Sequence, residues 1–93
     1  MRDNKGNIYE ALTILMEECA EVSVAASKMI RFGAGVEQSR KRLQEEVGDL
    51  LFMLFYLEHL DILDSGYYNS QMNNKKEKLK QWSDLQYLDD VKL

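Results

Sequence analysis

Apolar side chains recur at three- and four-residue steps through the first third of the chain. The series begins at Ile8 and continues with Leu12, Leu15, Cys19, Val22, Ala26 and Met29. Because an α-helix completes a turn every ~3.6 residues, this spacing predicts a helix from Ile8 to about Phe32. Asn7 is expected to cap its N-terminus, with Glu10 completing a capping-box pattern. Gly33 and Gly35 predict its end.

A second helix is predicted from about Val36 to Leu63, and it is the more apolar of the two. Its apolar residues are Leu43, Val47, Leu50, Leu51, Leu54, Phe55 and Leu57. From Val47 onward they surround the helix almost completely, which is typical of a buried element. Asp64 to Gly66 predicts a second break. A third helix follows from about Tyr68 to Trp82, and the tail after it suggests either a short fourth helix or a packing arm.

These elements predict an all-α fold. The chain contains no proline, and no stretch of it is patterned as a pair of strands. The short turn between the first two helices favours antiparallel packing. We therefore expect a single domain, residues 1–93, built as a small bundle of three or four helices with antiparallel core helices.

The hydrophobic content of the chain predicts that it forms an oligomer. A domain of 93 residues buries only about 60–65% of the surface of its unfolded chain. Hydrophobic residues nevertheless make up 45% of the sequence, more than a small monomer readily hides. We expect the second helix to be covered partly by another copy of the chain, in an oligomeric bundle with a dimer as the minimal unit.

Net charge and cysteine content limit the partners and the cellular compartment that we expect for the protein. The net charge of −4 disfavours nonspecific nucleic-acid binding, which needs a basic surface. Cys19 is the only cysteine, so a reducing, cytoplasmic setting is expected. The first residues lack the apolar core of a signal peptide. The longest apolar run holds Asp49 and is shorter than the ~20 residues that span a bilayer, so no membrane partner is expected.

Two acidic clusters with the same spacing interrupt the apolar stretches. They are Glu17, Glu18 and Glu21 in the first helix and Glu45, Glu46 and Asp49 in the second. Residues three apart project from one helix face, and a carboxylate within an apolar segment is costly to bury unless something pairs with it. Two faces of this kind meet if the helices pack antiparallel. Acidic pairs at this spacing are also common on solvated helix faces, so the pattern alone leaves both readings open.

The metal reading brings four carboxylates together, namely Glu18, Glu21, Glu46 and Asp49. Without a cation these groups would repel one another and raise each other's pKa values. Hard oxygen ligands favour Mg²⁺, with Mn²⁺ able to substitute. A ferritin-like di-iron site needs Glu-x-x-His pairs. The only histidine, His59, has Tyr56 three residues before it, which disfavours that alternative.

The two clusters resemble the EExxE…ExxD signature of the MazG-like all-α nucleoside triphosphate pyrophosphohydrolases. Glu17, Glu18 and Glu21 are followed after 24 residues by Glu46 and Asp49. The flanking segments 27–33 and 45–51 and the lysine-rich segment 75–82 are also similar to that family. The resemblance covers roughly residues 8–82.

The resemblance implies cleavage of a (d)NTP between its α- and β-phosphates, giving the monophosphate and pyrophosphate. It implies Mg²⁺ bound by Glu18, Glu21, Glu46 and Asp49, with Glu17 orienting or deprotonating the attacking water. Lys75 and Lys78, three apart on one face, are expected to contact phosphate, although a solvated role is an equal alternative for either. A nucleotide substrate and a homo-oligomer, dimer or tetramer, are the expected partners.

Two alternative functions stay open. One is phosphoribosyl-ATP pyrophosphohydrolase activity, which a related helical fold carries. The other is a non-catalytic oligomerisation or regulatory module built on the same scaffold. The module would tolerate substitution of Glu18 or Asp49, whereas the enzyme would lose turnover. The base and sugar of the substrate are not predicted.

Overall fold

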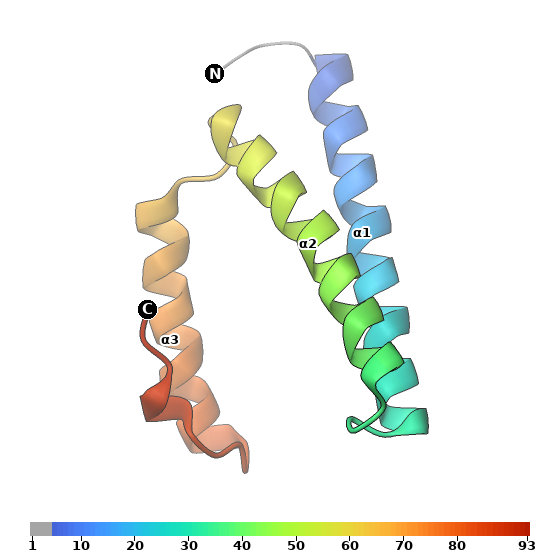
Figure 1. Cartoon of the computed structure of the whole chain (residues 1–93). Helices are drawn as coiled ribbons and strands as arrows, with labels where there is room; N and C mark the ends of the chain where they lie inside the picture. Colours follow the sequence, from blue (N-terminus) through green and yellow to red (C-terminus); the bar gives the residue numbers. More distant parts are fainter. Residues whose placement is uncertain (1–4) are drawn as a thin grey trace. The chain divides into compact units, whose positions relative to one another are not determined.

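The computed structural model describes residues 5–93. It contains three α-helices, α1 (Lys5–Phe32), α2 (Glu37–His59) and α3 (Ser65–Trp82), and a 3₁₀ turn, η1 (Leu88–Asp90) (Figure 1). The described residues contain no strand, which confirms the all-α prediction. By its internal contacts the chain divides into two compact units, one ending at Ile62 and the other beginning at Leu63.

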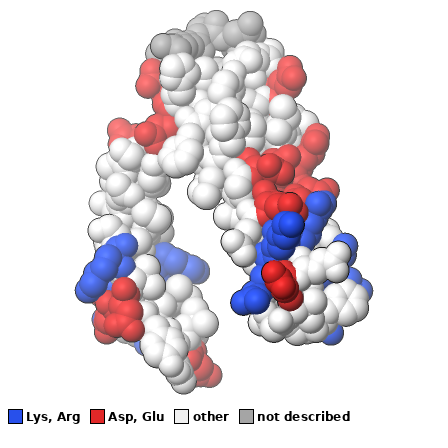
Figure 2. Space-filling view, in the orientation of Figure 1, with Lys and Arg blue, Asp and Glu red and all other residues white. Residues whose placement is uncertain are grey.

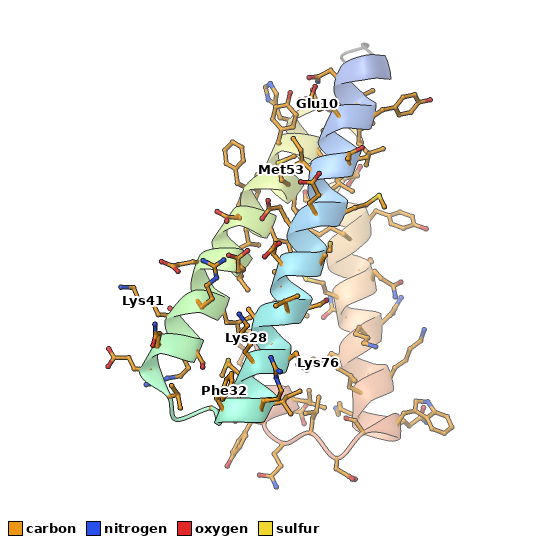
Figure 3. All side chains as sticks on the ribbon, turned by 90° about the vertical axis from the view of Figure 1, so that its right-hand side faces the viewer. Glu10, Lys28, Phe32, Lys41, Met53 and Lys76 are labelled. Atoms are coloured by element: carbon orange, nitrogen blue, oxygen red, sulfur yellow. The ribbon has the colours of Figure 1, made fainter. Side chains whose placement is uncertain are left out.

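The first unit is an antiparallel pair of helices, α1 and α2, that lie side by side along most of their length (Figure 1). The buried apolar residues of this unit are Ile8, Ala11, Ala25, Met53, Leu57 and Leu60. Met53 lies between the two helices (Figure 3). A hydrogen bond from the Asn7 amide nitrogen to the Tyr56 hydroxyl, 3.1 Å long, joins α1 to α2. The antiparallel arrangement predicted from the short turn is therefore confirmed.

The predicted N-terminus of the first helix is wrong. The helix already includes Lys5, so Asn7 lies within it and does not cap it. The capping-box pattern of Asn7 and Glu10 is therefore coincidental. The side chain of Asn7 is instead used across the helix pair, where the Tyr56 hydroxyl both accepts from its amide nitrogen and lies 3.3 Å from its amide oxygen.

The first helix ends at Phe32 as predicted, because Gly33 adopts a backbone φ of 99°. The second helix ends at His59, four residues before the predicted end. Asp61 takes a left-handed φ of 63°, and the amide of Ile62 bonds to the carbonyl of Leu57 at 3.0 Å. Together with the bond from Asp61 N–H to the Glu58 carbonyl, this is a Schellman termination.

The predicted break at 64–66 is instead the beginning of α3. The Asp64 carboxylate accepts hydrogen bonds from the amides of Gly66 (2.8 Å) and Tyr67 (3.2 Å) and so caps the helix. A β-carbon at Gly66 would lie 3.2 Å from that same carboxylate oxygen. The absence of a side chain there leaves room for the cap.

The second unit is α3 with the C-terminal tail folded against it. The Lys80 ammonium pairs with Asp89 at 2.9 Å and with Glu77 at 3.4 Å. Lys76 donates to the carbonyl of Val91 at 3.3 Å. None of the residues of α3 or η1 is buried. The tail is thus a packing arm with one short turn, held mainly by polar contacts.

Large apolar side chains remain exposed on both units. On α2, which was expected to be buried, Phe52 is 67% and Phe55 is 63% exposed. Ile30 on α1 and Trp82 on α3 are exposed to a similar or greater degree. No helix in the part of the chain that the structure describes combines the length and apolar character that crossing a membrane requires.

Candidate metal centre

Three of the predicted ligands come together where the middle parts of α1 and α2 face each other. Glu18 projects from α1, and Glu46 and Asp49 project from successive turns of α2. One carboxylate oxygen from each of the three lies within 4.8 Å of the others. We call Glu18, Glu46 and Asp49 the carboxylate triad. The spacing of three residues on α2 produces it, because it places Glu46 and Asp49 on one face toward α1.

The three residues of the triad differ in their exposure to solvent. Glu46 is only 5% exposed, Glu18 is half-buried and Asp49 is exposed. A ligand from solvent can therefore reach the cluster from the Asp49 side while Glu46 forms its inner wall. A metal centre that also binds a substrate needs this arrangement, with protein donors on one side and an open side for the substrate.

Among the residues that the structure describes, Arg42 is the cation paired with the buried carboxylate of the triad. The guanidinium Nη2 of Arg42 lies 3.1 Å from Oε1 of Glu46, one helical turn away on α2. This pair explains how a carboxylate tolerates burial without a bound ion. The bridge engages only one oxygen of Glu46.

Repulsion within the cluster is visible at Glu18. Its pKa is raised above the ordinary value, first by partial burial and then by the negative charges of Asp49 and Glu46. The carboxylates of Glu21 and Glu17 raise it further. A divalent cation would relieve this repulsion by favouring the ionised form of each group.

The other two acidic residues of the first motif lie at the edge of the cluster. Glu21 and Glu17 are both exposed, and neither belongs to the group whose ligand atoms approach within 4.8 Å. Both still act electrostatically on Glu18. Glu21 remains one helical turn from Glu18, so a change of side-chain rotamer is what it would need to join the triad.

The triad suits a small hard cation. All three donors are carboxylate oxygens, the ligand type that Mg²⁺ prefers, and opposite ligands of octahedral Mg²⁺ stand about 4.2 Å apart at its ~2.1 Å bond length. Among three ligands at least two pairs are neighbours, which stand only about 3.0 Å apart, so the three oxygens, which lie within 4.8 Å of one another, would have to draw closer to share one ion. Three protein oxygens would leave other positions for water or phosphate oxygens. The donor set therefore fits Mg²⁺ or Mn²⁺.

The lysines predicted to contact phosphate lie in the second unit. Lys75 and Lys78 are exposed residues of α3. Their neighbours Lys76 and Lys80 hold the C-terminal tail, so this helix divides its lysines between a structural role and solvent. The participation of Lys75 and Lys78 in the site stays a prediction.

A second group of cations, not singled out together from the sequence, lies within the first unit. Lys28 on α1 and Lys41 and Arg42 on α2 line a pocket of about 880 Å³ near the turn between these helices. Figure 2 shows basic side chains directly bordering acidic ones on this helix pair. The signal that could have revealed Arg42 is its spacing of four residues before Glu46, which is the spacing of a helical ion pair.

Comparisons of the chain with profiles of protein families, with curated proteins and with solved structures find no match. A proposal about function is therefore supported by the motif spacing and by the geometry of the triad.

Proposed function

We propose that the protein is a Mg²⁺-dependent nucleoside triphosphate pyrophosphohydrolase. The observation that carries the proposal is the meeting of Glu18 with Glu46 and Asp49 within 4.8 Å. These residues come from both halves of the EExxE…ExxD pattern, one half on each helix. A pattern of solvated surface charges gives no reason for the two halves to converge.

The roles follow from position. Glu18, Glu46 and Asp49 would hold Mg²⁺, with Glu21 as a fourth ligand. The metal would offset the phosphate charge and lower the pKa of the attacking water. Glu17, exposed beside the triad, would orient that water or accept its proton. Water adds to phosphorus, the α–β anhydride bond breaks, and pyrophosphate departs with the bond's electron pair.

A homo-oligomer is part of the proposal. The exposed Phe52 and Phe55 on α2 are suited to a second copy of the chain, because a helix that is apolar on most sides is stabilised by burial on more than one face. In such an assembly a neighbouring chain would be able to complete each pocket.

The deciding experiment is pyrophosphate release from a panel of canonical and modified (d)NTPs, in Mg²⁺ and in EDTA. We expect release only with metal, and a loss of roughly 100-fold or more in Asp49→Asn. Glu10→Gln, which makes the same charge change at an exposed site on α1 outside the triad, should retain activity. Mg²⁺ should also raise the Tm of the wild-type protein and have little effect on Asp49→Asn.

Absence of release from every nucleotide, with folded protein and metal present, would contradict the proposal. Release of pyrophosphate from phosphoribosyl-ATP alone would assign the related activity. If neither substrate is cleaved and Asp49→Asn leaves the Mg²⁺ response unchanged, the chain is a non-catalytic helical module.

A further inference from the structure

The pocket beside the triad has the composition of an anion site. It lies where the last turns of α1 meet the first turns of α2 (Figure 3) and has a volume of about 880 Å³. That volume is within the range of small-molecule sites, about 300–1,000 Å³. Its charged lining comprises three cations and one carboxylate, namely Lys28, Lys41, Arg42 and Glu45. The pocket is therefore net positive in a chain whose net charge is −4.

Two of these cations are available to a ligand. Within the part of the chain that the structure describes, neither Lys28 nor Lys41 takes part in an ion pair. They approach the pocket from different helices. Two ammonium groups that line one cavity from different helices are suited to an anion with several charged oxygens, because each supplies its own charge-assisted hydrogen bonds.

The beginning of α2 adds to the positive potential. Gln38 and Ser39, in the first turn of α2, line the pocket. Val36, at the N-cap, provides no side-chain hydrogen bond to that turn. A helix N-terminus carries a partial positive charge and amide donors suited to phosphate. Glu37 in the same turn carries a negative charge, so Lys28 and Lys41 remain the main source of positive potential.

The pocket and the triad share a boundary at Arg42. This residue lines the pocket, and its guanidinium contacts the buried Glu46 at 3.1 Å. The pocket is therefore adjacent to the triad through one ion pair. We propose that this pocket binds the terminal phosphates of the substrate, with Lys28 and Lys41 as their ligands; its catalytic meaning rests on the proposed function.

Binding of inorganic pyrophosphate and tripolyphosphate, measured by calorimetry in EDTA at low salt, tests the inference. EDTA removes any contribution of a metal on the triad. We expect the wild-type protein to bind both anions, and Lys28→Met and Lys41→Met each to weaken binding about tenfold. Lys92→Met, which removes the same charge from the exposed tail, should change affinity less than twofold, and Lys28→Arg should retain most of it. Circular dichroism confirms that each variant is folded.

Two results would overturn the inference. One is the absence of pyrophosphate binding by the wild-type protein, and the other is unchanged affinity in both pocket variants. If pyrophosphate affinity is lost only in Lys75→Met and Lys78→Met, both pocket variants are unchanged and the inference is overturned. The phosphates would then be assigned to α3.

Measuring (d)NTP hydrolysis by the same variants distinguishes a failure of the pocket assignment from a failure of the proposed function. Suppose that Lys28→Met and Lys41→Met cleave (d)NTPs with unchanged KM and bind pyrophosphate as tightly as the wild-type protein does. The assignment of the pocket is then wrong, and the proposed hydrolase activity is retained. If pyrophosphate binding depends on these lysines but no nucleotide is cleaved, the anion pocket stands and the hydrolase fails.

Discussion

Repulsion within the acidic cluster acts on the carboxylate of Glu18. Partial burial and the charges of Asp49 and Glu46 all raise its pKa above 4.5. In the metal-free protein, ionised Glu18 is therefore a source of instability. This is typical of a site whose geometry is maintained for binding at some loss of folded-state stability.

The pH dependence of stability follows from that shift. The pKa of Glu18 is higher in the folded state, so above pH 4.5 the folded protein binds more protons than the unfolded chain. The contribution of Glu18 to the free energy of unfolding therefore falls as the pH rises. We expect Glu18→Gln to have a higher Tm than the wild-type protein at pH 7.5 in EDTA. The difference should shrink as the pH is lowered toward 4.5.

Thermal melts across this pH range measure the effect, and adding Mg²⁺ should stabilise the wild-type protein more than Glu18→Gln. Glu10→Gln shows what the loss of one exposed carboxylate on α1 does by itself. A Glu18→Gln protein that is less stable than the wild-type protein at pH 7.5 would contradict the prediction.

Within α2, one turn of helix links the pocket to the triad through Arg42 and Glu46. Replacing Arg42 with a neutral residue would leave the carboxylate of Glu46, which is 5% exposed, without its partner. The guanidinium itself is largely exposed, so the loss is smaller than for a fully buried pair.

We expect Arg42→Gln to lower the free energy of unfolding by about 1 kcal/mol in EDTA, measured by urea denaturation. Saturating Mg²⁺ should restore much of this loss, because the ion would take over the neutralisation of Glu46. Arg40→Gln removes an exposed charge two residues away and should have a smaller effect. Equal destabilisation of the two variants would show that the bridge contributes little.

At the level of elements, the sequence predicts those features that depend on local pattern. The apolar period and Gly33 locate the first helix end correctly. The matched acidic spacing predicts a cluster of four carboxylates, of which Glu18, Glu46 and Asp49 lie together and Glu21 does not. The ends that were misplaced depend on subtler chemistry. Asp61 adopts a left-handed conformation usually taken by glycine, and Asp64 begins α3 where a break was expected.

The pocket could not be predicted in the same way. Lys28 and Lys41 share it only because of the register in which α1 and α2 pack. Periodicity within each helix identifies a face but does not determine which residue of one helix lies opposite which residue of the other. Asn7 illustrates the same limit, since its hydrogen bond to Tyr56 spans 49 positions.

For the molecule as a whole, exposed apolar area predicts self-association. Phe52 and Phe55 are both more than 60% exposed on a helix of the best-packed unit. We expect sedimentation at micromolar concentration to give a dimer or tetramer, and the Tm to rise with protein concentration. Phe52→Glu combined with Phe55→Glu should shift the mass toward the monomer. A stable monomer of the wild-type protein would contradict the expectation.

The turn between α1 and α2 has a consequence for how quickly the site is assembled. It consists only of residues 33–36, so the two helices that carry the triad are joined by a short loop, and contacts can spread from that loop toward the triad. Proteins dominated by such contacts fold in microseconds to milliseconds. Each closure of the hairpin brings like charges together, and a divalent cation would reduce that electrostatic barrier. A cation that binds the triad would therefore speed the closure of the helix pair.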